Sequence, residues 1–288
     1  MLHIANLTKT YPNGTKALNG INLTIGSGVF GLLGPNGSGK SSLMRTIATL
    51  QKPDNGTVHF REIDVLNQPE QMRAVLGYLP QEFGVYPTIS AEDMLHHLAV
   101  LKGIIDRAER RTAVDHLLEM TNLSQHRKKK LGGYSGGMKQ RFGIAQALLG
   151  APRILIVDEP TAGLDPIERD RFHQLLNVVG EKITVILSTH IVSDVSELCN
   201  EMAILHQGRV LMQMSPKGAI ETLKGKIWAA LLSQSEVEPH AKSDWIISSR
   251  LLHGKHLLKV YSDSNPASDF HSVEPDLEDV YFSQIKGF

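Results

Sequence analysis

The chain has 288 residues, 41% of them hydrophobic and 21% charged, which is enough for one large domain or for a large and a small one. Its 30 Lys and Arg balance its 30 Asp and Glu, so no general attraction to nucleic acid or to an anionic membrane is expected. Cys199 is the only cysteine, which excludes an intrachain disulfide and fits a reducing compartment. The sequence shows neither a signal-peptide pattern nor the ~18 apolar residues of a spanning helix, so we expect a soluble chain that reaches a membrane only through a partner.

The first part of the chain predicts a strand, a glycine-rich turn and a helix. Residues 29–33 form a short apolar run that leads directly into the turn. In the helix that follows, Leu43, Ile47 and Leu50 stand at helical spacing, and Pro53 closes it. A strand that passes through a glycine-rich turn into a helix is the context in which proteins bind phosphate groups.

The middle of the chain predicts a helical lobe followed by alternating strands and helices. The lobe covers about residues 85–150, with expected helices at 91–101, 107–120 and 138–149. Strands and helices then alternate along the chain, at 154–157, 167–179, 183–187 and 192–198. Alternation of this kind predicts an α/β fold with a mostly parallel sheet, into which the helical lobe is inserted.

The last part of the chain predicts a small α+β appendage. Its expected elements are short strands at 227–232, 244–248 and 257–261. We therefore expect a main domain at 1–222 and a second, smaller domain at 223–288.

Residues 34–41 match the phosphate-binding loop, whose pattern is G-x-x-x-x-G-K-S/T. Its glycines let the backbone approach a triphosphate, and backbone amides at a helix N-terminus attract anions. Lys40 would reach the β- and γ-phosphates, and the Ser41 hydroxyl would coordinate Mg²⁺. We assign nucleotide contacts to the consecutive residues Gly34, Pro35, Asn36, Gly37, Ser38, Gly39, Lys40, Ser41 and Ser42.

Two adjacent carboxylates, Asp158 and Glu159, end the strand predicted at 154–157. Asp158 is placed to hold Mg²⁺, and Glu159 can polarise an attacking water. In isolation, paired acids at a strand end indicate a solvated turn. The phosphate loop upstream favours the catalytic interpretation.

Ser135, Gly136 and Gly137 stand directly before an apolar-periodic helix. Serine in this position is a standard helix N-cap. The same geometry offers amides and a hydroxyl to a phosphate, so both interpretations can hold. If the helical lobe stands apart from the phosphate loop, Ser135 can reach only the nucleotide of a second copy.

Taken in order, these motifs resemble the nucleotide-binding subunit of an ATP-binding-cassette (ABC) transporter over about residues 1–220. The resemblance implies a P-loop NTPase fold and adds four residues to the site. Tyr11 would stack on adenine, and Asp165 would lie in the loop that crosses between subunits. Gln81 would act in catalysis by sensing Mg²⁺, and would join the core to the lobe. His190 would contact the γ-phosphate, whereas the other twelve histidines are expected to be surface or packing residues.

The family signature departs from its common form at two positions. Tyr134 and Met138 stand where leucine and glutamine are usual, but the core Ser135-Gly136-Gly137 is intact. We therefore expect its contact with the γ-phosphate to survive.

The resemblance implies a mechanism and partners. Two copies would enclose two ATP molecules, with Glu159 activating water and Lys40 and Mg²⁺ stabilising charge. A separate transmembrane permease would hold the chain at the cytoplasmic face of the membrane. Residues 275–282 are similar to the tail of bacterial export-type subunits.

Two other functions fit the motifs less well. A soluble ABC mechanoenzyme acting on ribosomes or DNA would need a second cassette, a coiled-coil arm or a basic surface, none of which the sequence predicts. A cassette that only regulates would lack catalytic groups, but Lys40, Glu159 and His190 are all present. The sequence leaves open the transported substrate, the direction of transport, the role of the terminal domain, and whether the partner subunit is identical.

Overall fold

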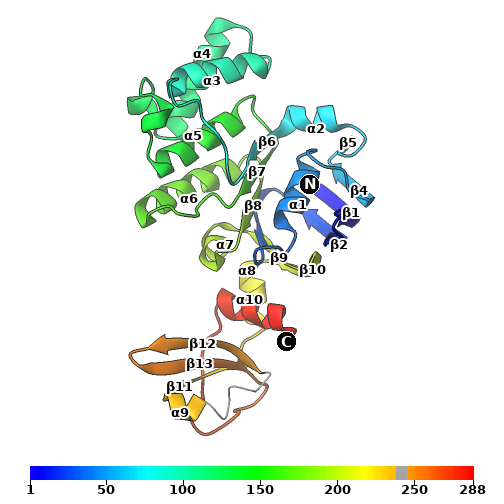
Figure 1. The fold of residues 1–288 in the computed structure, drawn as a ribbon, viewed down its shortest axis with the longest axis vertical. Helices are drawn as coiled ribbons and strands as arrows, with labels where there is room; N and C mark the ends of the chain where they lie inside the picture. The colour runs from blue at the N-terminus through cyan, green and yellow to red at the C-terminus, as the bar shows by residue number, and fades with distance from the viewer. Residues whose placement is uncertain (238–244) are drawn as a thin grey trace.

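The computed structural model describes residues 1–237 and 245–288, and a six-stranded sheet lies at its centre (Figure 1). The strand order is β10-β9-β3-β8-β7-β6, and every neighbouring pair except β9 and β10 is parallel. The strands are β3 (Gly28–Leu33), β6 (Leu76–Leu79), β7 (Ile154–Asp158), β8 (Thr184–Thr189), β9 (Glu201–His206) and β10 (Arg209–Met214). The carboxyl ends of the parallel strands meet at one edge, which is where open α/β sheets bind ligands.

Helix α1 (Lys40–Ile47) packs against the central sheet and also against a four-stranded antiparallel sheet. The antiparallel sheet consists of β1 (Leu2–Thr10), β2 (Lys16–Ile25), β4 (Asn55–Phe60) and β5 (Ile63–Asp64), and the sequence analysis did not predict it. One apolar cluster joins this sheet, α1 and the central sheet. The expectation that Leu50 belongs to this helix was wrong, because α1 stops at Ile47, and the Leu50 side chain is 62% exposed.

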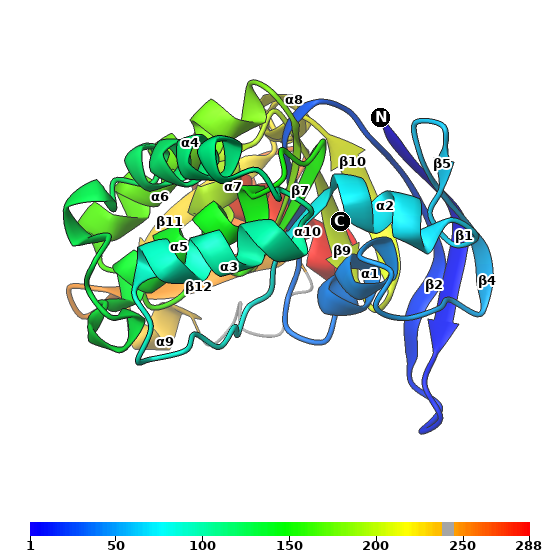
Figure 2. The same ribbon diagram turned by 90° about the horizontal axis from the view of Figure 1, so that it is seen from above.

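The helical lobe lies on the opposite side of the central sheet from β1 and β2 (Figure 2). Two of its helices, α3 (Ala91–Leu101) and α4 (Arg107–Met120), have the predicted bounds, and α5 (Gly136–Leu148) begins two residues early. Helix α6 (Pro166–Gly180) shares an apolar cluster with the lobe and the sheet. The α/β fold with an inserted helical lobe is thus confirmed. Helices α2 (Pro69–Val75) and α7 (Val192–Leu198) complete this region.

The terminal segment forms an antiparallel sheet of order β12-β13-β11-β14. Its elements are β11 (Ile227–Leu232), α9 (Gln234–Val237), β12 (Ile246–Leu252), β13 (Lys255–Tyr261), β14 (His271–Ser272) and α10 (Leu277–Lys286). The predicted strands at 227–232 and 257–261 are confirmed; of the one expected at 244–248, Asp244 lies outside the described residues.

Helix α10 packs back on the main domain. An apolar cluster joins Leu277 and Val280 of α10 to Val195 of α7, Ile204 of β9 and Ala219 of α8 (Pro216–Glu221). The division at residue 222 stays a prediction, since this cluster crosses it. Within the described ranges, no helix is both long and apolar enough to span a bilayer.

Candidate active site

The phosphate loop connects β3 to α1 and can be built only with glycine at two positions. Gly39 has φ +108°, and a Cβ there would lie 2.3 Å from the carbonyl oxygen of Ala17. A Cβ on Gly34 would lie 2.3 Å from the carbonyl oxygen of Leu205. Gly39 also leaves the first turn of α1 without a side-chain cap. The amides of that turn are therefore available to an anion.

Lys40 is 5% exposed and bends back across the loop. Its Nζ donates to the carbonyl oxygens of Gly34 and Pro35, at 2.7 and 3.3 Å, and lies 3.5 Å from Glu159 Oε1. Burial lowers the pKa of Lys40, and the Glu159 carboxylate opposes part of that shift. The ammonium group is thus held between the phosphate loop and the predicted catalytic base.

Glu159 follows the end of β7 in a left-handed backbone conformation, with φ 49°. For a residue other than glycine, such a conformation costs on the order of 1–3 kcal/mol, so the surroundings must hold it. Its N–H donates to the carbonyl oxygen of Ser188 at 2.9 Å, and its Oε2 lies 2.6 Å from His190 Nδ1. The structure therefore brings together Lys40, Glu159 and His190, three of the four residues predicted to catalyse the reaction, and the fourth, Gln81, lines the same pocket as Lys40 and Glu159.

The surroundings of Asp158 fit a magnesium ion. Asp158 is 4% exposed, and its Oδ1 has no hydrogen-bond partner among residues 1–237 and 245–288. Burial raises the pKa of Asp158, and the nearby Ser188 hydroxyl and the Lys40 charge oppose this shift. Ser41 and Gln81 stand at the adjoining pocket. Mg²⁺ needs few protein ligands, since it keeps waters and phosphate oxygens, and these oxygen donors suit it.

One pocket of about 230 Å³ gathers most of the predicted site. Tyr11, Gln81 and Glu159 line it together with residues 36–42 of the loop. The Tyr11 hydroxyl lies 3.0 Å from Ser42 Oγ and donates to Gln51 Oε1 at 3.0 Å, so the ring is fixed at the pocket wall. A larger apolar cavity of about 530 Å³ lies between α4 and α6, and no predicted site residue lines it.

The signature segment stands apart from this pocket. Ser135 caps α5, with its Oγ accepting a hydrogen bond from the Met138 N–H at 3.2 Å. Ser135 and Gly136 are exposed, and neither they nor Gly137 line the phosphate-loop pocket. The expected N-cap is confirmed. The exposed Ser135–Gly136 surface is free to meet a second chain.

The two unusual signature residues fill the core of the lobe. Tyr134 is buried, and its hydroxyl donates to the carbonyl oxygen of His126 at 3.0 Å. Met138 is buried in the same apolar cluster. Neither side chain belongs to the exposed surface that Ser135 and Gly136 form.

Asp165 caps α6, as expected from its sequence. Its Oδ1 accepts hydrogen bonds from the N–H groups of Ile167 and Glu168, at 3.0 and 2.9 Å. Asp165 is exposed and does not line the pocket. Glu168 in the next turn lies 3.2 Å from Arg141 of α5, which ties α6 to the signature helix.

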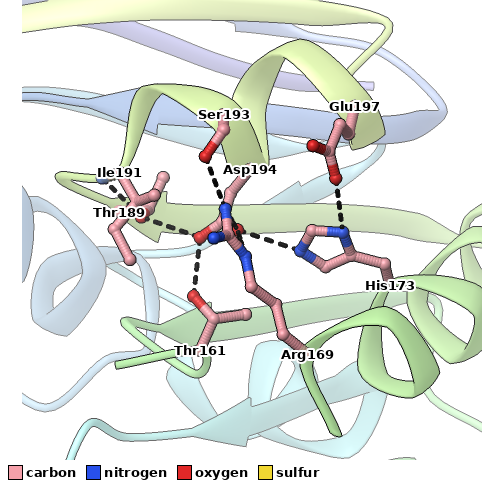
Figure 3. Close-up of polar contacts among 8 residues, drawn as sticks. All are labelled: Thr161, Arg169, His173, Thr189, Ile191, Ser193, Asp194 and Glu197. Carbon is pink, nitrogen blue, oxygen red and sulfur yellow. Dashed lines mark hydrogen bonds and ion pairs between the residues drawn. The ribbon is translucent and has the colours of Figure 1, made fainter. Parts of the chain in front are cut away.

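A buried polar cluster that was not predicted from the sequence joins α6, α7, the turn after β7 and the end of β8 (Figure 3). Its centre is Asp194 of α7, which is 0% exposed and contacts Thr161, Arg169, His173 and Thr189. The expectation that His173 is a packing residue overlooked these contacts. One signal was available: Asp194 lies on the face that Val195 and Leu198 bury, where a carboxylate is unusual.

Comparisons with known proteins agree with this geometry. A family model described as "ABC transporter" matches residues 18–162. The probable multidrug ABC transporter ATP-binding protein YbhF of Escherichia coli is 32% identical over 304 residues, covering 100% of this chain and 52% of that protein. The chain thus spans about half the length of that relative. The daunorubicin/doxorubicin resistance ATP-binding protein DrrA of Streptomyces peucetius is 30% identical, covering 93% of this chain and 79% of that protein.

Solved structures show the same fold. A dimeric bacterial ABC transporter cassette matches with a TM-score of 0.68 and 30% identity, over 75% of this chain and 98% of that one. A dimeric cassette in a post-hydrolysis state, bound to ADP and phosphate, matches with a TM-score of 0.67 and 29% identity, over the same shares of the two chains.

Proposed function

The chain belongs to the ABC transporter family, and we propose that it is an ATP-hydrolysing subunit that powers an exporter. The observation that carries this proposal is the single pocket in which the phosphate loop, Tyr11, Gln81 and Glu159 meet. The printed names of relatives support the direction of transport, since they describe multidrug transport and drug resistance. We place the chain at the cytoplasmic face of a membrane.

The pocket can bind ATP and hold the reacting groups. The amides at the start of α1 and the Lys40 ammonium would hold the phosphates, and Tyr11 would contact the adenine. A triphosphate would compete with Glu159 for Lys40. Glu159, still fixed at Oε2 by His190, would then accept the proton of the attacking water.

Asp158, Ser41 and Gln81 would hold Mg²⁺. When bound, this ion supplies positive charge beside the β- and γ-phosphates.

A second copy of the chain would complete each site. The exposed Ser135 and Gly136 would contact the γ-phosphate held by the partner's loop, and Asp165 would lie in the interface. ATP then stabilises only the closed pair, because those phosphate contacts exist only there. Hydrolysis removes this difference and allows the pair to open.

The permease would be reached through the segment that joins Gln81 to the helical lobe. Two apolar side chains of this segment, Phe83 and Val85, pack against the core of the lobe. Tyr86 is 63% exposed, so its ring is the side chain that would contact a membrane partner.

Tyr11→Ala is expected to weaken ATP binding about 10-fold, because stacking of a base on an aromatic ring contributes ~1–3 kcal/mol. Tyr11→Phe keeps the ring and loses only the hydroxyl contacts with Ser42 and Gln51, so its Kd should stay close to the wild-type value. Titration with a fluorescent ATP analogue measures both variants. Equal affinity of all three proteins would remove Tyr11 from the binding site.

Capture of tagged protein from solubilised native membranes tests the proposed function. We expect a stoichiometric membrane protein with several spanning helices, identified by mass spectrometry with and without ATP. Recovery of ribosomal proteins or nucleic acid instead would contradict the transporter assignment.

Tyr86→Ala is expected to lower recovery of that membrane protein several-fold while leaving the ATPase rate of the isolated chain unchanged, since Tyr86 does not line the nucleotide pocket. Leu251→Ala is the matched control, because Leu251 of β12 is 69% exposed but belongs to the terminal sheet. Equal recovery with Tyr86→Ala and Leu251→Ala would place the docking surface elsewhere.

A further inference from the structure

We propose that Asp194 is a positioning residue that fixes the two loops carrying Glu159 and His190. The proposal rests on the hydrolytic role proposed for this pair of residues. Asp194 itself does not line the nucleotide pocket, so it would act on catalysis only through the residues it holds.

One carboxylate oxygen of Asp194 accepts hydrogen bonds from the loop that carries Glu159 and from the last residue of β8, which precedes His190 (Figure 3). Thr161, two residues after Glu159, donates from Oγ1 to Asp194 Oδ2 at 2.6 Å. Thr189, the residue before His190, donates from Oγ1 to the same oxygen at 3.2 Å. Because the two hydroxyls bind one atom, Asp194 couples the loop after β7 to the end of β8, from which His190 follows.

The second loop is fixed on both sides of His190. Thr189 Oγ1 accepts a hydrogen bond from the Ile191 N–H at 2.9 Å, so its own proton is directed to Asp194. On the first loop, the Glu159 N–H is bound to the Ser188 carbonyl oxygen. These bonds set the backbone from which Glu159 Oε2 and His190 Nδ1 approach to 2.6 Å.

The other oxygen of Asp194 is anchored on α6. Asp194 Oδ1 accepts from Arg169 Nε at 2.8 Å and lies 2.9 Å from His173 Nε2. His173 Nδ1 lies in turn 3.1 Å from Glu197 Oε2, which orients the ring. Burial opposes the charged form, yet the hydrogen bonds from His173 and Thr161 and the charge of Arg169 hold the pKa of Asp194 below its usual range. Asp194 thus remains an ionised acceptor for both threonines.

The arrangement also explains how Glu159 keeps its left-handed backbone. Its conformation is unfavourable for a residue with a side chain, and the next residues must hold it. Asp194 of α7 provides that restraint through its hydrogen bond with Thr161, and neither residue lines the nucleotide pocket. Small displacements of catalytic groups reduce rates strongly, so loosening this restraint should lower turnover.

Thr161→Val and Thr189→Val test the proposal, because each removes one hydroxyl and nearly preserves side-chain volume. Neither threonine lines the nucleotide pocket. We expect kcat for ATP hydrolysis to fall about 10-fold or more in each variant, since misplacement of about 1 Å can lower a rate ~100-fold. The Kd for ATP should stay within about twofold, since the phosphate contacts remain. Thr161→Ser and Thr189→Ser should restore most of the rate.

Thr184→Val is the matched control. Thr184 is buried in the same strand as Thr189, and its hydroxyl donates to the Gly26 carbonyl oxygen at 3.0 Å, at the far end of β8. It should keep the wild-type kcat. If it loses as much activity as Thr189→Val, loss of any buried hydroxyl in β8 explains the effect, and the positioning role is overturned.

Amide exchange gives a readout that needs no turnover. The Ile191 amide, bound to Thr189 Oγ1, should exchange faster in Thr189→Val, and also in Thr161→Val if Asp194 couples the loops. Unchanged exchange in Thr161→Val, or a wild-type kcat in both valine variants, overturns the positioning role. A wild-type protein that hydrolyses no ATP contradicts the proposed function instead.

Discussion

Replacing Glu159 by glutamine is expected to lower kcat for ATP hydrolysis by at least ~100-fold, the usual contribution of a general base. The amide keeps the size of the side chain but cannot accept the proton of the attacking water. It also removes a negative charge from the pocket proposed to hold the γ-phosphate, so ATP should remain bound and the closed pair of chains should accumulate. Phosphate release and light scattering with Mg²⁺ and ATP measure the two effects.

Glu181→Gln is the control for this variant. Glu181 is an exposed glutamate just after α6, far along the helix from Asp165, and its replacement should leave both turnover and association unchanged. Full activity in Glu159→Gln would show that another group acts as the base.

Replacing Lys40 by methionine is expected to weaken ATP binding by roughly 10- to 100-fold, because a hydrogen bond to a charged group contributes about 1.5–3 kcal/mol. The apolar stem of Met fills the space of the lysine stem, so the buried loop can keep its shape. The variant also leaves Glu159, 8% exposed, without its ammonium partner. Calorimetric titration with ATP gives the Kd.

Lys217→Met, at an exposed lysine of α8, should bind ATP like the wild-type protein. The two active-site variants are thus expected to lose different steps, turnover in one and ATP binding in the other. Glu159→Gln keeps ATP and loses turnover, whereas Lys40→Met loses ATP. An unchanged Kd in Lys40→Met would mean that the loop does not hold the phosphates.

The parts of the site that could be predicted from sequence are those set by short-range geometry. The phosphate loop needs glycine at fixed places, and the caps of α5 and α6 are formed by Ser135 and Asp165 within three residues of their partners. The parallel strand order then brings Glu159 and His190 together, since both follow strand ends at one edge of the sheet.

The antiparallel sheet was missed because its strands do not alternate regularly. In β1 the pairing register shifts between Ile4 and Leu7, and Asn6 takes a left-handed conformation with φ 50°. The buried residues are therefore Leu2, Ile4 and Leu7, which breaks a period of two. Similarly, α1 ends early at a point where Thr49 has φ 60°.

The cluster around Asp194 was missed for a different reason. Asp194 contacts Thr161, Arg169 and His173, which lie 33, 25 and 21 positions earlier in the chain. Contacts over such separations cannot be predicted from a local sequence pattern. Only the carboxylate on the buried face of α7 was visible in the sequence, and its partners required the packed structure.

The central claim is that each ATP is hydrolysed between two chains, and mixing two inactive variants tests it most directly. Lys40→Met impairs phosphate binding by the loop and leaves the signature residues unchanged. Gly136→Asp breaks the signature: a Cβ at Gly136 meets nothing within 4 Å, so the new carboxylate fits its own chain but repels a phosphate bound to the partner.

Each variant alone should be inactive. In an equal mixture, half of the dimers contain one of each chain and have one intact site of two, so ATP turnover of roughly a quarter of the wild-type rate is expected. A mixture no more active than the separate variants would contradict the shared site.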